Sequence, residues 1–265
     1  MEIDARTVVC LLLKGKSFYK TTQFGDPVYL GDPLNIVRIF NEKEADELCI
    51  LDIEASRTGE PPMFDFLARL AGECFMPISY GGGIRTMEDC RHLIGIGFEK
   101  VVINSRLDEA PEILTEVADR FGSQAVIASI DVRRDDQGKA TVWTYGGTRQ
   151  TGADPTSYAR QAEALGAGEI LLTSIDRDGT RAGYDLDLIR SVTEAVQVPV
   201  IACGGADSLE GLAAAVLDGK ASGAAAGSLF VFYGPRRAVL LNPPTYEEFQ
   251  AALASGMAAR GVSAT

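Results

Sequence analysis

Glycines and small polar residues follow several short apolar runs, in positions where a phosphate could bind. Gly81-Gly82-Gly83 and Asn104-Ser105 follow two neighbouring runs, and Gly204-Gly205 and Gly227-Ser228 follow two later ones. Glycine lets an anion approach backbone N–H groups closely, and Asn and Ser add side-chain donors. Two such groups predict two phosphate cradles and an elongated ligand with a phosphate at each end. Alternatively, the glycines serve only the tight turns between strands and helices.

These residues must be positioned by a repeated pattern of β-rich runs and amphipathic stretches. The expected strands are Thr7–Leu13, Glu47–Asp52, Pro77–Tyr80, Lys100–Ile103, Ala125–Asp131, Glu169–Thr173, Val198–Ala202 and Gly223–Gly227. The expected helices include Met63–Ala71, Met87–Ile96, Ala110–Phe121, Pro155–Leu165, Asp187–Val196 and Leu209–Leu217. Eight strands that alternate with helices predict an α/β fold, the (β/α)₈ TIM barrel, with its active site at the C-terminal ends of the strands.

The second half of the chain echoes the first at a displacement of about 120 residues, which indicates two similar half barrels. We expect residues 1–265 to form a single TIM-barrel domain, with the barrel over about 6–230 and a divergent C-terminal helical segment over about 231–265. Two insertions stand out: a long loop from Lys14 to Gly31 after strand 1, and a hairpin over Asp135–Thr151 after strand 5.

Composition excludes several classes of function. The 265 residues carry 25 Lys and Arg against 37 Asp and Glu, a net charge of −12, so nucleic acid and anionic membranes are poor partners. His92 is the single histidine, which argues against a His-based zinc site and most catalytic triads. We expect no metal and no cofactor. The five cysteines form no CxxC pair, and no signal peptide or membrane span is evident, so we expect buried thiols and a cytoplasmic protein.

Five longer runs resemble the cyclase subunit of imidazole glycerol phosphate synthase. These runs are Tyr80–Ile84, Val102–Ser105, Phe121–Val126, Gly166–Thr180 and Ala202–Ala206, and the similarity extends from about Arg6 to Phe230. In that family a barrel takes ammonia from a separate glutaminase subunit. It uses the ammonia to split and cyclise a ribulosyl phosphate intermediate of histidine biosynthesis. The resemblance implies a substrate with a phosphate at each end, in agreement with the two cradles.

The resemblance also implies which residues hold the two phosphates. Gly83, Asn104 and Ser105 would bind one phosphate. The other would be bound by residues near the ends of strands 6, 7 and 8, namely Asp178, Gly179, Gly205, Gly227 and Ser228.

The family's ring closure needs two carboxylates that face each other across the mouth of the barrel, as general acid and general base. Asp131 ends strand 5 and matches one of them, so it is the candidate catalytic residue. The partner position on strand 1 is Leu12, where the family has aspartate. Asp52 matches a different family aspartate, and Glu54 is a weak substitute. Because an alkyl group cannot transfer a proton, we expect the ordinary cyclase reaction to be lost, and the alternative reading of Asp131 is a structural strand-end acid.

Four charged residues begin strands 1, 2, 4 and 6: Arg6, Glu47, Lys100 and Glu169. In the resembled family such a ring closes the barrel floor and gates the entry of ammonia. The simpler alternative is a set of salt bridges of small stabilising value. The four positions match the family, so we expect the ammonia gate to be retained.

The chain departs from the synthase beyond Phe230, where Val231–Pro244 is similar to cyclase-like proteins associated with glycosyl amidation in bacterial surface polysaccharide clusters. In that system a glutaminase, the barrel and an ATP-dependent amidotransferase convert a sugar acetamido group into an acetamidino group. The ligand would then be a phosphorylated small molecule or a nucleotide-sugar. Arg236-Arg237 is either a solvated turn or a contact to a partner or phosphate.

Three hypotheses follow from these patterns. The first is an ammonia-conducting barrel subunit of a glutamine-dependent amidation system for O-antigen and other surface polysaccharide. The second is a working synthase subunit in which another acid replaces Leu12. The third is a non-catalytic scaffold that holds glutaminase and amidotransferase together.

Overall fold

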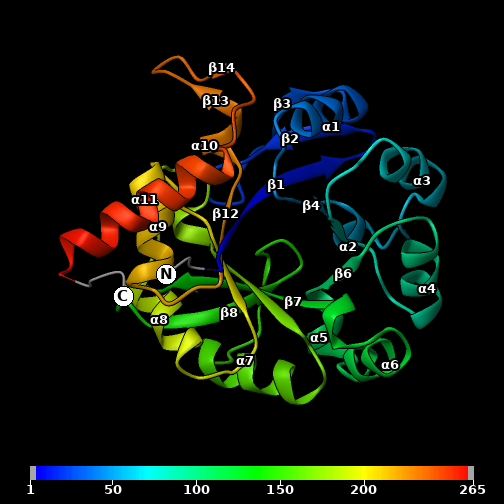
Figure 1. Ribbon diagram of the computed structural model, residues 1–265. Coiled ribbons are helices and arrows are strands. Elements are labelled where there is room, and N and C mark those ends of the chain that lie inside the picture. Colours follow the sequence, from blue (N-terminus) through cyan, green and yellow to red (C-terminus); the bar gives the residue numbers. More distant parts are fainter. Residues whose placement is uncertain (1–3, 262–265) are drawn as a thin grey trace.

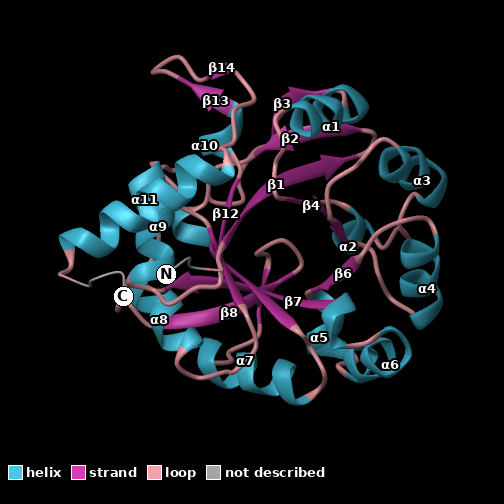
Figure 2. Cartoon of the chain, viewed as in Figure 1, coloured by secondary structure: helices cyan, strands magenta, loops and turns pink. Residues whose placement is uncertain are grey.

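Eight parallel strands close into a barrel with helices packed around it (Figures 1 and 2). The coordinates are a computed structural model that describes residues 4–261. In spatial order the barrel strands are β1 (Arg6–Lys14), β4 (Glu47–Asp52), β5 (Ile78–Gly81), β6 (Lys100–Ile103), β7 (Val126–Arg134), β10 (Glu169–Ser174), β11 (Val200–Cys203) and β12 (Gly223–Ala226). Strand β12 pairs with β1 in parallel, which closes the sheet. The predicted (β/α)₈ barrel is confirmed.

The barrel strands are buried on both faces, which explains their nearly continuous apolar runs. On β1, Val8 and Cys10 belong to the cluster inside the barrel, whereas Val9 and Leu11 pack in the larger core between barrel and helices. This alternation follows from the two-residue period of a strand. Every second residue of a barrel strand therefore lies on the inner wall, where it can contribute to a site.

The helices of the outer layer begin at short polar residues that cap them. Asp32, Asp154, Asp185 and Ser208 each accept a hydrogen bond from a backbone N–H in the first helical turn. Thr86 forms a capping box with Asp89. The main helices are α1 (Pro33–Glu42), α3 (Phe64–Gly72), α4 (Met87–Gly95), α6 (Glu112–Phe121), α7 (Pro155–Ala164), α8 (Leu186–Thr193), α9 (Leu209–Leu217) and α11 (Tyr246–Ala259). Short helical turns are α2 (Ala55–Thr58), α5 (Ser105–Glu109), η1 (Ser123–Ala125), η2 (Ile175–Arg177) and α10 (Ser228–Val231).

The segments outside the barrel contain more β-structure than the sequence patterns predicted. The long loop after strand 1 holds β2 (Ser17–Lys20) and β3 (Val28–Gly31), which continue the sheet as antiparallel neighbours of β1. The hairpin after strand 5 is formed by β7 and β8 (Ala140–Thr144), with β9 (Arg149–Gln150) beside them.

The C-terminal segment that we predicted to be helical begins with a hairpin instead. Strands β13 (Phe232–Tyr233) and β14 (Ala238–Val239) pair antiparallel, and the helix spans only Tyr246–Ala259. Gly234 and Pro235 favour a turn between the two strands, and Pro243-Pro244 delays the helix because proline lacks a backbone donor. Residues 262–265 of the predicted segment lie outside the described residues.

Candidate functional site

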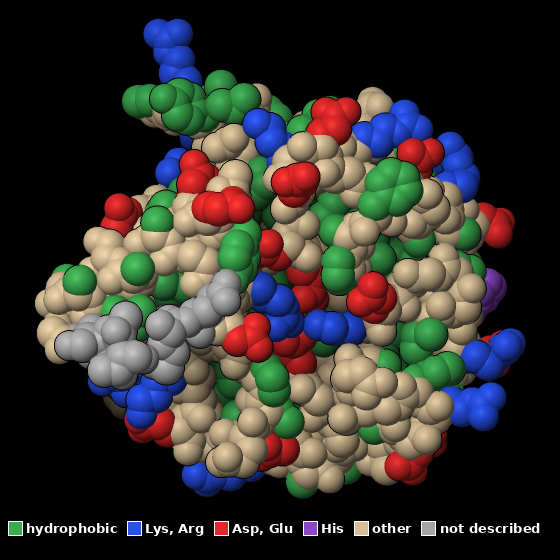
Figure 3. Space-filling view, viewed as in Figure 1, with side chains coloured by type: hydrophobic (Ala, Val, Ile, Leu, Met, Phe, Trp, Pro, Cys, Tyr) green, Lys and Arg blue, Asp and Glu red, His purple; other side chains and the backbone are tan. Residues whose placement is uncertain are grey.

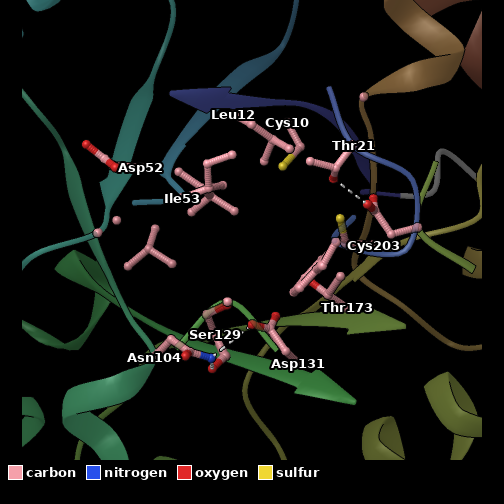
Figure 4. A pocket seen from close by; sticks show the side chains of 18 of the residues that line it. Cys10, Leu12, Thr21, Asp52, Ile53, Asn104, Ser129, Asp131, Thr173 and Cys203 are labelled. Carbon is pink, nitrogen blue, oxygen red and sulfur yellow. Dashed lines mark hydrogen bonds between the residues drawn. The ribbon is translucent and has the colours of Figure 1, made fainter. Parts of the chain in front are cut away.

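A cavity of about 190 Å³ opens at the C-terminal ends of the barrel strands. Inner-wall residues from β1, β4, β6, β7 and β10 line it, together with the glycine turns that follow β5, β11 and β12. Figure 4 shows Asp131 and Asn104 on one side of this cavity and Leu12 and Cys10 on the opposite side. The predicted mouth residues therefore converge on one cavity, as expected for an active site of this fold.

Asp131 lies on the inner face of β7 and is 8% exposed. Burial raises the pKa of its carboxyl group to about 7, and a hydrogen bond from Thr173 opposes the rise. The side-chain amide of Asn104 donates to Asp131 Oδ2 at 3.2 Å and to the backbone oxygen of Ser129 at 3.0 Å. A buried carboxyl group that titrates near neutrality can donate or accept a proton, so Asp131 is chemically suited to acid–base work.

No second carboxylate stands where the family reaction would need it. Leu12, 8% exposed, presents an alkyl group across the cavity from Asp131 (Figure 4). Asp52 Oδ1 accepts the backbone N–H groups of Glu54 and Ala55, both at 2.9 Å. Glu54 itself forms an ion pair with Lys14 at 2.8 Å. The two acids considered as substitutes are therefore engaged in local structure.

The residues predicted to form the first cradle lie at the ends of β5 and β6. Gly83 has a positive φ of 71°, and a Cβ atom there would lie 2.6 Å from the backbone oxygen of Glu60, so only glycine fits. Asn104 points toward Asp131, so its amide joins the cradle to the catalytic candidate. Ser105 Oγ accepts the backbone N–H of Tyr145 at 3.1 Å, which brings the hairpin after β7 against this cradle.

The residues predicted to form the second cradle lie in segments that follow β10, β11 and β12. Its members Asp178, Gly179, Gly205, Gly227 and Ser228 all line the same cavity. Asp178 Oδ2 accepts a hydrogen bond from Thr21 at 3.1 Å, and burial raises the pKa of its carboxyl group. Gly179 and Gly205 both adopt positive φ, and a Cβ on either would collide with a neighbouring carbonyl oxygen. These backbone turns are thus shaped for close approach.

Lys20 is a site residue that sequence reasoning missed. It ends β2, is 3% exposed, and its Nζ donates to the backbone oxygen of Cys10 at 3.3 Å. A Cβ on Gly227 would collide with this Nζ, so the ammonium lies directly against the second cradle. The adjacent aromatic residues Phe18 and Tyr19, which favour a strand, were the available signal, but the glycines and polar residues around them favoured a loop.

Four charged side chains form a closed ring at the opposite end of the barrel. Arg6 contacts Glu47 at 2.6 Å and also pairs with Glu169, and Lys100 reaches the same two carboxylates at 3.2 and 2.9 Å. Both glutamates are buried. Basic and acidic side chains gather near the centre of Figure 3, where the barrel of Figure 1 lies. The structure thus brings together the four residues that we predicted as the ammonia gate.

An apolar layer separates this ring from the mouth cavity. Val8, Cys49, Val102 and Leu171 each lie two residues beyond a ring member on the same strand, and all belong to the cluster inside the barrel. The two-residue period therefore places ring, apolar layer and mouth in succession along the inner wall.

Within residues 4–261, no group of three or more His, Cys, Asp and Glu is arranged to hold a metal ion. Over the same residues, no helix is both long and apolar enough to span a membrane.

Fold and site together define a TIM-barrel protein with a cavity at one end of the barrel and a closed ion ring at the other. The family of histidine biosynthesis proteins matches residues 6–235, and the chain belongs to this family. A Pseudomonas aeruginosa relative, provisionally named imidazole glycerol phosphate synthase subunit hisF2, is 48% identical over 242 residues, which cover 91% of this chain and 96% of the relative.

Two further relatives carry similarly provisional names. The synthase subunit hisF3 of Vibrio vulnificus is 44% identical over 95% of this chain and 97% of its own length. The synthase subunit HisF of Leptospira borgpetersenii is 42% identical over 90% of this chain and 94% of its own length. The resemblance to the cyclase family is confirmed by these matches.

Proposed function

We propose that this chain is the ammonia-conducting barrel subunit of a glutamine-dependent amidation system that converts a sugar acetamido group to acetamidino in surface polysaccharide biosynthesis. A glutaminase releases ammonia at the floor, the interior conducts it, and it leaves at the mouth. The observation that carries this proposal is the contrast between a complete floor ring and a mouth in which Asp131 faces Leu12 where the family reaction needs a second carboxylate.

The floor and interior support the conduction of ammonia. The Arg6, Glu47, Lys100 and Glu169 ring covers the end of the barrel at which a glutaminase would dock, and the relatives are named as subunits of a synthase. Neutral ammonia crosses the apolar layer around Val102 more readily than water-borne ammonium, because that layer gives a cation no partners. Keeping the nitrogen unprotonated preserves its lone pair for attack.

The mouth supports a reaction other than ring closure. Ring closure needs an acid and a base on opposite sides of the substrate, and Leu12 can be neither. In amidation, an ATP-dependent amidotransferase activates the acetamido oxygen by transferring a phosphoryl or adenylyl group to it. Ammonia then forms the new C–N bond, and the oxygen leaves with the transferred group. Asp131, whose carboxyl pKa is raised to about 7 by burial, is placed to accept a proton at the ammonia exit.

The two cradles support a phosphorylated ligand at the mouth. Gly83, Asn104 and Ser105 line one end of the cavity, and Asp178, Gly179, Gly205, Gly227 and Ser228 line the other. A phosphorylated small molecule or nucleotide-sugar fits this arrangement, because the local backbone turns and Lys20 can bind an anion within a protein of net charge −12.

The first test asks whether the family reaction has been lost. The purified chain is mixed with the ribulosyl phosphate intermediate and excess ammonium at high pH, with an active synthase cyclase subunit as positive control. We expect no imidazole glycerol phosphate above background. Product formation at the rate of the control, abolished by Asp131→Asn, would overturn the proposal and favour a synthase subunit with a different acid.

The second test asks whether the barrel conducts ammonia. The chain is reconstituted with a glutaminase, an amidotransferase and glutamine that carries an isotope-labelled amide nitrogen. We expect label in the acetamidino product, and a loss of glutamine-coupled transfer in Lys100→Ala with ammonium-driven transfer retained. Lys220→Ala, which breaks an exposed pair with Glu194, is the matched control. Equal transfer by all three proteins would instead indicate a scaffold.

A further inference from the structure

We propose that Arg237, on the C-terminal hairpin, is a binding residue for the anionic end of the ligand held by the second cradle. It extends that cradle beyond the mouth cavity and thereby selects a ligand whose phosphate reaches the rim. This inference rests on the phosphorylated ligand of the proposed function, and it is independent of the conduction of ammonia.

The hairpin is anchored directly to the cradle. Helix α10 starts at Ser228, a buried residue of the cavity wall, and runs without a break into β13. The returning chain is tied back by hydrogen bonds from the backbone N–H of Leu240 to Val231 O at 3.0 Å and of Asn242 to Phe230 O at 2.8 Å. The β13–β14 hairpin projects from the barrel edge beyond α10 (Figure 1). Its position relative to Ser228 is therefore set by main-chain contacts.

Arg237 reaches from this hairpin to the cradle. Its Nη2 lies 3.5 Å from Ser228 Oγ, and its guanidinium stacks over the ring of Phe232 at 4.7 Å. Phe232 is itself buried in the core, so it provides a fixed platform. A planar guanidinium in this position can share an anion with the serine hydroxyl, since arginine binds phosphate oxygens in a bidentate manner.

The charges around the cradle point to an anionic ligand. In the described part of the chain the guanidinium of Arg237 forms no ion pair with a carboxylate, although acids outnumber bases by 37 to 25 in the sequence. Buried Lys20 lies against Gly227 on the inner side of the same turn. The Lys20 ammonium also interacts with the buried carboxyl group of Asp178 in this cradle, so Arg237 supplies a further positive charge for an anion there.

The backbone conformation of Arg237 decides which substitution tests the proposal most cleanly. Its φ is +52°, in the left-handed region that disfavours residues with a Cβ. Glycine would be favoured here on conformational grounds. This geometry also makes Arg237→Gly an informative variant, because it removes the guanidinium without straining the turn.

Calorimetric titration of the purified chain with inorganic pyrophosphate and with inorganic phosphate tests the proposal. We expect Arg237→Gly to weaken pyrophosphate binding by about tenfold, the usual effect of one charge-assisted hydrogen bond, with an unchanged melting temperature. Arg236→Gly, which removes the same charge from the exposed neighbouring position, should change affinity less than about twofold.

Equal weakening by Arg236→Gly and Arg237→Gly would show a general charge effect and overturn the proposal, as would no weakening by either. Arg237→Lys should recover only part of the affinity, because an ammonium lacks the planar fork of a guanidinium. Failure of ammonia conduction would leave these binding differences unchanged, so the two proposals fail separately.

Discussion

The two ends of the barrel differ in whether their buried charged groups have partners of opposite charge. At the floor, Arg6 and Lys100 each contact both Glu47 and Glu169, so the buried charges are balanced within one ring. At the mouth, Asp131 is buried, forms no ion pair within residues 4–261, and has a carboxyl pKa raised to about 7. Buried charges that balance one another form a fixed structure, as in the floor ring. A buried carboxyl group without a balancing cation remains available for proton transfer, as at Asp131.

Breaking the floor ring should have the largest effect on stability. Lys100→Ala leaves the two buried glutamates with a single cation, and removal of one partner from a buried ion pair costs about 3–5 kcal/mol. Urea denaturation measures this change in the free energy of unfolding. Lys220→Ala, in an exposed pair with Glu194, should cost less than about 1 kcal/mol. Equal losses in the two variants would contradict a buried, coupled ring.

The mouth carboxyl should make stability depend on pH. Folding raises the pKa of Asp131 from its ordinary value of 3.8 to about 7, so the folded state binds more protons between these values. The contribution of Asp131 to the free energy of unfolding should therefore be fully present below about pH 4 and be lost as the pH rises through 7. Above pH 7 the free energy of unfolding should be lower by on the order of 4 kcal/mol. Asp131→Asn should remove this component, as measured by urea denaturation from pH 5 to 9. Parallel pH profiles for the two proteins would contradict the raised pKa.

A carboxylate introduced at position 12 should change the pKa of Asp131 across the mouth cavity. Leu12→Asp removes buried apolar surface, at a cost of about 1.5–3 kcal/mol, and places a second acid opposite Asp131. The pKa of Asp131, followed by nuclear magnetic resonance, should rise further because a like charge disfavours ionisation. Leu12→Asn is the uncharged control and should leave that pKa nearly unchanged. A gain of cyclase turnover in Leu12→Asp alone would show that Leu12 is the block, whereas an unchanged rate in an already active protein would support the synthase alternative.

The smallest expected effect concerns the second cradle. The φ of Gly227 is −113°, which alanine can adopt, so Gly227→Ala acts through collisions of its Cβ with the Lys20 side chain and with the backbone oxygen of Cys10, which would lie 2.8 Å away. Displacing this ammonium should weaken phosphate binding by about tenfold, or 1.4 kcal/mol, in a calorimetric titration. Gly72→Ala, in a helix with open space at its Cβ, is the control and should leave binding unchanged. Unaltered affinity in Gly227→Ala would remove Lys20 from the anion site.

Several features could be predicted before the structure because they depend on local pattern. The strands Glu47–Asp52 and Lys100–Ile103 have the predicted bounds, since a parallel barrel strand is buried on both faces and reads as an apolar run. Asp131 and the glycine turns were found from their places after such runs. The antiparallel strands β2 and β3 were not, because their pairing with β1 stabilises a segment whose composition is typical of a loop.

By itself the sequence determined the barrel and the charged residues at its floor, because strand periodicity and residue type are local properties, whereas the meaning of Leu12 came from the resemblance to the cyclase family. Only the tertiary structure decided that Lys20 lies against Gly227 and that Arg237 reaches Ser228. These contacts join segments through strand pairing and close packing. The raised pKa of Asp131 likewise depends on burial by the folded barrel. Burial and long-range pairing are properties of the closed fold, which no local pattern contains.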